Sequence, residues 1–224
     1  MSSSGRRIGV LGGMFDPPHI GHHVMMDQVW EALELDEIFM VPCAHPPHRG
    51  NPIADFAERV EMCNFHSSYL MDRRGALFSP KIKVSMVEYR LSAPNYSWRM
   101  VREFKKNHLR DEVFLIMGGD EYSSLPSWNR PDILLEEVNI VCAESGGRRA
   151  NKRPLLDGER VSFVDVEGVC GISSTMIRRR ILENRTVRHL VIPDVHDYIR
   201  SHCIYERGEN GENHQGDDLN KDQD

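Results

Sequence analysis

The sequence lacks the features of membrane-bound, secreted or disulfide-stabilised proteins. No apolar run approaches the roughly 20 residues that a helix needs to span a bilayer. Residues 1–7 contain no apolar stretch of the kind found in signal peptides. The five cysteines are an odd number without a C-x-x-C pair, so neither a disulfide framework nor a structural zinc site is expected. These absences favour a cytoplasmic protein whose thiols are reduced and mostly buried.

Most of the chain also has almost no excess of negative over positive charge. The formal net charge of the 224 residues is −6. Residues 206–224 hold seven acidic and two basic residues and contribute −5, which leaves −1 for the remainder. We therefore expect one domain over residues 1–205 and an acidic, disordered tail over residues 206–224. The nearly neutral domain argues against a dedicated nucleic-acid binder, and no internal repeat is present.

Apolar segments with strand and helix patterns alternate along the whole chain, which predicts an α/β fold. We expect a doubly wound, mainly parallel sheet with helices on both faces. Residues 145–157 are rich in glycine and basic residues and are predicted to form a mobile loop. The predicted strands are residues 6–11, 37–41, 82–87, 112–117, 138–143 and 161–164. The predicted helices are residues 20–33, 54–70, 96–107, 133–137, 173–183 and 193–202.

The segment after the first predicted strand has the composition of an anion-binding loop. Gly12 and Gly13 allow a tight turn and a close approach of the backbone to a ligand. The following helix points its first amide groups at the same edge of the sheet, where anions are stabilised. His19 and His22 are three residues apart and lie on one helix face. Together they predict a phosphate site; a metal site would need a third ligand, and none has convincing spacing nearby.

A second phosphate site is predicted at the start of the helix over residues 173–183. Ser173, Ser174 and Thr175 have hydroxyl groups that suit a helix cap. Arg178 follows one turn later, so hydroxyl, amide and guanidinium groups could meet one phosphate. Helix capping alone would also explain the three hydroxyl residues.

Two motifs give the chain a resemblance to a known superfamily. Residues 12–22, Gly-Gly-Met-Phe-Asp-Pro-Pro-His-Ile-Gly-His, resemble the G-G-x-F-D-P-x-H-x-G-H signature of the H-x-G-H nucleotidyltransferases. Residues 172–178, Ile-Ser-Ser-Thr-Met-Ile-Arg, resemble the I-S-[ST]-T-x-I-R motif of the same superfamily. The order of the motifs matches, and the resemblance extends to about residue 205, so it implies a Rossmann-like fold.

Further segments resemble bacterial-type nicotinate-mononucleotide adenylyltransferases. They are residues 46–49 (Pro-Pro-His-Arg), 93–97 (Ala-Pro-Asn-Tyr-Ser), 117–120 (Met-Gly-Gly-Asp) and 125–128 (Leu-Pro-Ser-Trp). Such enzymes join ATP and nicotinate mononucleotide, form deamido-NAD and release pyrophosphate. The resemblance implies an in-line attack without a protein nucleophile, catalysed by positioning and charge stabilisation. It also implies Mg²⁺, held chiefly by the phosphates of ATP, with no metal-ligating residue of the chain.

The resemblance and the residue chemistry together assign three groups of site residues. The catalytic group is His19, His22 and Arg178. The ATP-binding group is Gly12, Gly13, Phe15, His19, Gly21, His22, Gly118, Asp120, Ile172, Ser173, Ser174 and Arg178. The mononucleotide-binding group is Met14, His48, Arg49, Tyr96, Ser97 and Trp128. Arg179 and Arg180 are expected on the surface.

Several of these residues have a plainer interpretation. Asp120 could bind ribose hydroxyls or cap a helix, and Trp128 could stack on a pyridine ring or pack in the core. His48 and Arg49 could close over phosphates or lie in a solvated loop. Met14 stands where a threonine or serine is usual, and Ser97 replaces a threonine. Trp98 follows Ser97, and its place relative to the pocket is open.

Other functions share parts of the pattern. The segment His-Ile-Gly-His also occurs in class I aminoacyl-tRNA synthetases, but a K-M-S-K-S-like segment and a tRNA-binding domain are missing. A pantetheine-phosphate adenylyltransferase fits residues 95–97 and 126–128 less well. Nicotinamide mononucleotide as the acceptor, dual specificity, and a non-enzymatic nucleotide sensor remain alternatives. We expect small-molecule partners only, without nucleic acid or membrane, and a homo-oligomer is possible.

Overall fold

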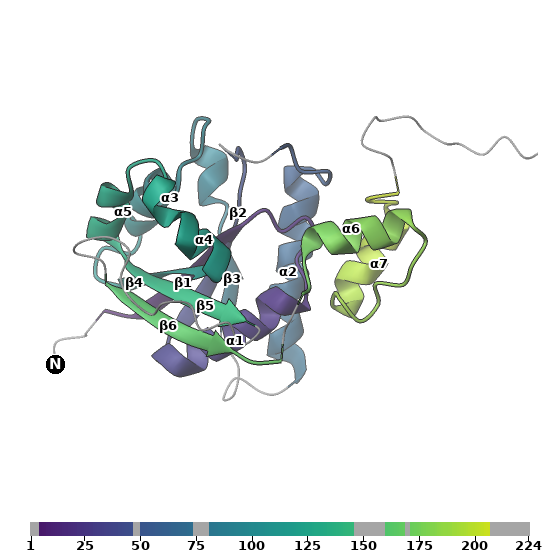
Figure 1. The fold of residues 1–224 in the computed structure, drawn as a ribbon, viewed down its shortest axis with the longest axis horizontal. Helices are drawn as coiled ribbons and strands as arrows, with labels where there is room; N and C mark the ends of the chain where they lie inside the picture. The colour runs from purple at the N-terminus through teal and green to yellow at the C-terminus, as the bar shows by residue number, and fades with distance from the viewer. Residues whose placement is uncertain (1–4, 47–49, 74–80, 146–159, 169–170, 207–224) are drawn as a thin grey trace, which may run out of the picture.

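A six-stranded parallel sheet forms the centre of the molecule (Figure 1). The computed structural model describes residues 5–46, 50–73, 81–145, 160–168 and 171–206. The strand order is β3-β2-β1-β4-β5-β6, and every pairing is parallel. The strands are β1 (Arg7–Gly13), β2 (Glu37–Pro42), β3 (Ile82–Val84), β4 (Glu112–Gly118), β5 (Asn139–Ser145) and β6 (Val161–Val166). This order reverses between β1 and β4, where doubly wound folds bind nucleotides.

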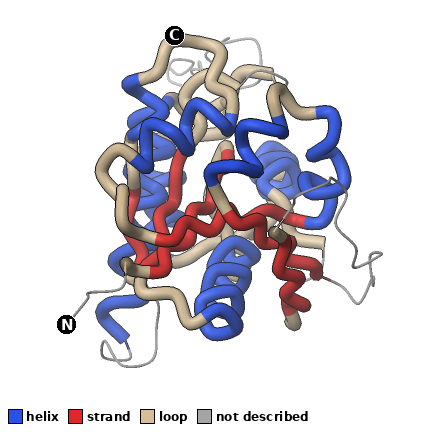
Figure 2. Tube along the Cα trace, turned by 90° about the vertical axis from the view of Figure 1, so that its left-hand side faces the viewer, coloured by secondary structure: helices blue, strands red, loops and turns tan. Residues whose placement is uncertain are grey.

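Helices cover both faces of the sheet, as Figure 2 shows. One face packs on α1 and α2 through residues such as Met26 and Cys63, and the other packs on α3, α4 and α5. The α-helices are α1 (Ile20–Leu33), α2 (Phe56–Arg73), α3 (Ser97–Lys105), α4 (Gly119–Ser124), α5 (Pro131–Glu137), α6 (Ser174–Leu182) and α7 (Pro193–Ser201). Two 3₁₀ helices are η1 (Val87–Arg90) and η2 (Leu125–Ser127). The predicted Rossmann-like fold class is confirmed.

A third apolar cluster joins α2 to the two carboxyl-terminal helices. Ile177 of α6 and Val195 and Ile199 of α7 are buried with Met62 of α2. Figure 1 shows α6 and α7 beside α2, outside the two helical layers that cover the sheet. The second sequence motif therefore reaches the nucleotide-binding edge from a separate packing unit.

Two short elements differ from the sequence prediction. The strand predicted over residues 82–87 ends at Val84, and residues 87–90 form η1 instead. The chain turns there because the carboxylate of Glu88 is buried and accepts a hydrogen bond from the backbone of Ala44. Helix α4 directly follows β4 and was not predicted; Glu121 at its third position accepts a 3.4 Å hydrogen bond from the Gly118 amide. Short elements with such caps carry little periodic signal.

The remaining sequence predictions are met in part. Cys63 and Cys142 are buried free thiols and Cys43 is half-buried, but Cys203 is exposed because it lies just beyond the end of α7. No helix among the described residues is long and apolar enough to cross a membrane. Cys170, residues 146–157 of the loop predicted over 145–157 and residues 207–224 of the tail predicted over 206–224 lie outside the described residues. Ser145, predicted to begin the loop, instead ends β5.

Candidate active site

The loop between β1 and α1 brings the first motif to the nucleotide-binding edge of the sheet. Gly13 ends β1 beneath Phe15, and a Cβ atom on Gly13 would lie 3.2 Å from the Phe15 ring. Phe15 has a positive φ of 49° and a buried ring in the core. A Cβ atom on Gly12 would meet nothing closer than 3.9 Å. The absence of a side chain at Gly13 thus allows the Phe15 ring to pack on the backbone of the loop. At Gly12 the space beside the backbone is unfilled.

The side chains of His19 and His22 stack at the start of α1. Their ring centroids are 3.8 Å apart, with 29° between the ring planes. The backbone amide of His19 donates a 3.1 Å hydrogen bond to Nδ1 of His22. A ring nitrogen that accepts a hydrogen bond carries no proton, so a neutral His22 has its proton on Nε2. His22 can therefore donate from Nε2 to a ligand oxygen.

Both histidines are uncharged at neutral pH. Burial lowers the pKa of His19, whose exposure is 7%, to about 4. Burial also lowers the pKa of His22 well below its usual range, and the neighbouring His19 and His66 act in the same direction. The pair would therefore act on a phosphate through hydrogen bonds and not through positive charge.

His23 and His66 form a second histidine layer behind this pair, which the sequence did not predict. The ring centroids of His23 and His66 are 5.6 Å apart. His66 of α2 is fully buried, and neither of its ring nitrogens has a hydrogen-bond partner among the described residues. Burial, together with smaller effects of the neighbouring His23 and His19, lowers the pKa of His66 to about 3. Folding therefore requires a neutral His66.

This requirement predicts a loss of stability in acid. The folded pKa lies below the ordinary value of 6.5, so the stability contributed by neutral His66 is present above pH 6.5 and is lost as the pH falls towards 3. For His66 alone, we expect the free energy of unfolding to fall by about 2 kcal/mol between pH 8 and pH 5. His66→Leu should reduce the pH dependence by this amount in denaturant titrations. Replacing the exposed His189 by glutamine is the control; an equal pH dependence in the parent and His66→Leu would contradict the assignment.

The second motif contacts the first through Arg178. Its Nη1 atom donates a 2.7 Å hydrogen bond to the backbone oxygen of Asp16, a residue 162 positions away in the sequence. The Oγ atom of Ser174 donates to the backbone oxygen of Pro17 at 2.8 Å. Ser173 caps α6, as predicted, by accepting a 3.2 Å hydrogen bond from the Met176 amide. The two predicted phosphate sites thus lie side by side.

Asp16 holds this junction together. Its two carboxylate oxygens accept hydrogen bonds from the amides of Ile53 and Ala54, both at 3.0 Å, and from the hydroxyl of Tyr205 at 2.9 Å. Nη1 of Arg178 lies 3.7 Å from the carboxylate. Burial and the Asp16 charge raise the pKa of Tyr205. Asp16 is part of the quoted motif, but its partners lie far away in sequence and could not be predicted.

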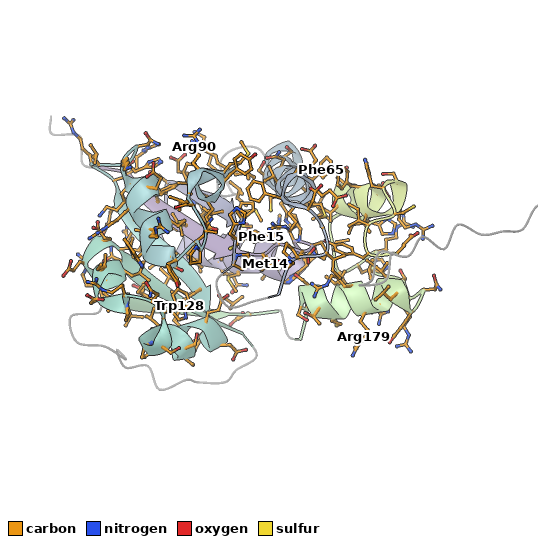
Figure 3. The ribbon with its side chains drawn as sticks, turned by 90° about the horizontal axis from the view of Figure 1, so that it is seen from above. Met14, Phe15, Phe65, Arg90, Trp128 and Arg179 are labelled. Carbon is orange, nitrogen blue, oxygen red and sulfur yellow. The ribbon has the colours of Figure 1, made fainter. Side chains whose placement is uncertain are left out.

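A cavity of about 450 Å³ opens beside the loop, at the ends of β1 and β4. Four of the six predicted mononucleotide-binding residues line it, together with two predicted ATP-binding glycines: Met14, Tyr96, Ser97, Trp128, Gly12 and Gly13. Figure 3 shows Met14 at the centre of the molecule and Trp128 on the side of the α4 and α5 helices. Nε1 of Trp128 donates a 3.0 Å hydrogen bond to Oγ of Ser124. Predicted acceptor residues from three separate segments therefore meet in one cavity.

Other predicted residues lie outside the walls of this cavity. Asp120 is exposed in the first turn of α4, and because Gly118 is the N-cap of α4, the capping alternative for Asp120 is wrong. Trp98 is not a wall residue; its Nε1 atom donates a 3.0 Å hydrogen bond to Oδ1 of Asn129, which is one. Ile172 packs against the third apolar cluster, and Gly21 is buried in α1. His48 and Arg49 lie outside the described residues.

The cavity has polar walls that sequence reasoning missed. Cys43, Glu88 and Asn95 line it, and the buried Arg59 donates a hydrogen bond to the backbone of Cys43. A buried charge leaves little trace in a sequence, because charged residues are usually read as solvated. Asn95 belongs to the resembling segment 93–97, although no role was assigned to it, and this is the one local signal for any of the three.

The fold and this site define a nucleotidyltransferase. Folds with this order of strands bind nucleotides at the point where the order reverses, which here is the end of β1. Neutral histidine donors, an arginine and the amino termini of α1 and α6 lie together at this edge, and such groups suit phosphates. Transfer between phosphates needs no protein nucleophile, and none is required of these residues.

Comparisons with known proteins give the family. A model of the cytidylyltransferase-like family matches residues 10–180. A protein of Shouchella clausii named probable nicotinate-nucleotide adenylyltransferase is 33% identical over 92% of this chain and 100% of its own length. A protein of the same name from Thermus thermophilus is 35% identical over 89% of this chain and 99% of its own. The chain therefore belongs to the cytidylyltransferase-like family and, within it, to the nicotinate-nucleotide adenylyltransferases.

Solved structures agree on the fold. The nicotinic acid mononucleotide adenylyltransferase of Plasmodium falciparum, complexed with NaAD, has a TM-score of 0.72 to this structure at 18% identity. The match covers 90% of this chain and 98% of the Plasmodium chain. At this identity the similarity describes the arrangement of the sheet and helices.

Proposed function

We propose that the protein transfers the adenylyl group of ATP to nicotinate mononucleotide and so makes deamido-NAD and pyrophosphate. The observation that carries this proposal is the position of the cavity. It is lined by Gly12, Gly13 and Met14 of the loop after β1 and by Tyr96, Ser97 and Trp128. An acceptor in the cavity would therefore have its phosphate next to the triphosphate of ATP.

The reaction would be an in-line displacement at the α-phosphorus. An oxygen of the acceptor phosphate forms a bond to this phosphorus, and the bond to the oxygen that bridges to the β-phosphate breaks. His22 would donate from Nε2, and His19 from its ring, to the α-phosphate oxygens on which charge accumulates. Arg178 and the first amides of α6 would bind the leaving pyrophosphate. We infer that positioning and hydrogen bonding carry most of the catalysis.

The pyridine carboxylate is the group that the cavity would select. Helix α3 begins at Ser97 after Tyr96, and both residues line the cavity. The amino terminus of a helix favours an anion over a neutral carboxamide. Trp128 lies where an indole could stack on the pyridine ring. These features favour nicotinate over nicotinamide mononucleotide.

We propose that Mg²⁺ is bound through the phosphates of ATP. Across the described ranges, no group of three or more histidine, cysteine, aspartate or glutamate side chains is placed to hold a metal ion. Mg²⁺ bound to ATP has chiefly phosphate oxygens and water as its ligands. The ion would supply neutralisation of the phosphate charge, and the histidines and Arg178 would orient the phosphates.

Pyrophosphate release tests the proposal. We expect release with ATP, Mg²⁺ and nicotinate mononucleotide, and a kcat/KM at least about tenfold lower with nicotinamide mononucleotide, which corresponds to about 1.4 kcal/mol of discrimination. Equal or better use of the amidated mononucleotide would contradict the acid preference. ATP binding without release of pyrophosphate from either acceptor would favour a nucleotide sensor.

A further inference from the structure

Arg59 of α2 is a buried cation under the acceptor cavity. Its side chain is 1% exposed. Nη1 donates hydrogen bonds to the backbone oxygens of Met14 at 2.9 Å and Cys43 at 2.7 Å, and Nε donates to that of Ala54 at 3.2 Å. Met14 follows β1, Cys43 follows β2, and both line the cavity. A single guanidinium thus links two walls of the cavity from below.

Glu88 links the second wall to a third one. Its exposure is 5%, and Oε2 accepts hydrogen bonds from the Ala44 amide at 3.0 Å and from Nδ2 of Asn95 at 3.2 Å. Nδ2 of Asn95 also donates to the backbone oxygen of Glu88 at 2.8 Å, and the amide of Asn95 donates to the backbone oxygen of His45 at 3.0 Å. Asn95 leads directly into Tyr96 and Ser97. The segment after β2 is therefore tied to the start of α3.

Arg59 and Glu88 also compensate each other electrostatically. Burial raises the pKa of Glu88, while hydrogen bonds from Cys43, Ala44 and Asn95 and the charge of Arg59 act against the rise. Burying two opposite charges costs free energy that well-packed apolar residues would not cost. Neither charge touches the phosphate-binding residues His19, His22 or Arg178 in any hydrogen bond of the described residues.

We propose that Arg59 and Glu88 are positioning residues for the acceptor. They form a buried brace, defined as Arg59, Glu88 and Asn95, that fixes the spacing between Met14, the segment 43–45 and the segment 95–97. The inference rests on the proposed function, because these three segments are the walls around the pyridine nucleotide. The ATP side is held by Asp16, which shares only the Ala54 residue with Arg59 and has no hydrogen bond with Glu88 among the described residues, so loss of Glu88 should weaken acceptor binding and spare ATP binding. Displacement of a binding group by about 1 Å is enough for a large effect.

Variants of Glu88 test the brace. Glu88→Ala should raise the KM for nicotinate mononucleotide about tenfold or more, with the KM for ATP and the kcat at saturating acceptor within about twofold of the parent. Glu88→Gln should recover most of the loss, since an amide oxygen can accept the same two hydrogen bonds. Glu37→Ala is the matched control, because Glu37 is 3% exposed and paired with Arg6 and Lys83 at the opposite end of β2. The control should be destabilised without any change in either KM.

A variant of Arg59 and a measurement without catalysis complete the test. Arg59→Lys keeps the positive charge but loses the planar guanidinium donors, so the KM for the acceptor should rise several-fold. Arg102→Lys is the control, because Arg102 bonds Glu137, and it should leave this KM unchanged. In hydrogen exchange, the amides of Ala44 and Asn95 should exchange faster in Glu88→Ala than in Glu37→Ala. An unchanged acceptor KM, or unchanged exchange at these amides, would overturn the proposal. If the parent transfers to neither mononucleotide, the proposed function fails, while amide exchange still decides whether the brace exists.

Discussion

Replacing His19 by alanine is expected to lower kcat by about 10²–10³-fold while the protein remains folded. Removal of one preorganised donor to a developing negative charge has an effect of this size in other enzymes. The backbone amide of His19, which orients His22 through Nδ1, is retained in the alanine variant. One of the two contacts that orient His22 is thus kept, while the stacking of the His19 ring on His22 is lost with the side chain. The KM for ATP should change much less than kcat, because the hydrogen bond strengthens in the transition state.

His23 provides the matched control for this experiment. It is buried to a similar degree, at 8% exposure against 7% for His19, but its ring lies near His66 and Tyr69. His23→Ala should lower the melting temperature and leave kcat within about threefold of the parent. Single-turnover rates with both substrates saturating would separate the chemical step from product release. A kcat near the parent value in His19→Ala would remove His19 from the catalytic group.

Local patterns carried most of the fold prediction. Helix α1 begins and ends where the apolar spacing predicts, and every predicted α-helix exists within a few residues of its predicted bounds. Long helices and strands are predictable because each further turn or residue repeats the same spacing of apolar residues. The exceptions, α4 and η1, are too short to repeat a pattern. Their bounds depend on single contacts, such as that of Glu121 with the Gly118 amide.

The site likewise has a part that the sequence predicts and a part that it does not. The residues that would bind phosphate are contiguous in two motifs, so the sequence could indicate them. The groups that hold those motifs in place are separated along the chain. Tyr205 is 189 positions from its partner Asp16, and Arg59 is 45 positions from Met14. A charged residue buried by tertiary contacts cannot be distinguished by spacing from one that is solvated.

Met14 shows how the sequence and the tertiary contacts together define the role of one residue. The sequence marks it as a departure, since a hydroxyl residue is usual at this position. The backbone oxygen of Met14 accepts a hydrogen bond from Arg59, and Met14 is one of the residues that line the cavity. A methionine therefore keeps the backbone bond to Arg59 but offers no hydroxyl donor to a phosphate or a substrate. We therefore expect Met14 to lower the affinity for the acceptor. The brace then contributes more to keeping the walls of the cavity in place.

Replacing Arg178 by alanine is expected to lower kcat/KM for ATP by about 10³-fold, or about 4 kcal/mol of transition-state stabilisation. The guanidinium contacts Asp16 at the junction of the two motifs, where the leaving pyrophosphate would lie, and its side chain is 23% exposed. The same change removes its hydrogen bond to Asp16, so the melting temperature should also fall. Stability and catalysis must therefore be measured separately.

Lysine at the same position separates the two effects. Arg178→Lys keeps a positive charge near the Asp16 carboxylate and should recover much of the melting temperature. It cannot offer the planar pair of donors that matches phosphate oxygens, so most of the loss in kcat/KM should remain. Arg179→Ala is the control on the same helix, since Arg179 is exposed and points away from the molecule (Figure 3). If the Arg178 variants lose activity only in proportion to their melting temperatures, Arg178 is a structural link between the motifs and does not bind the leaving group.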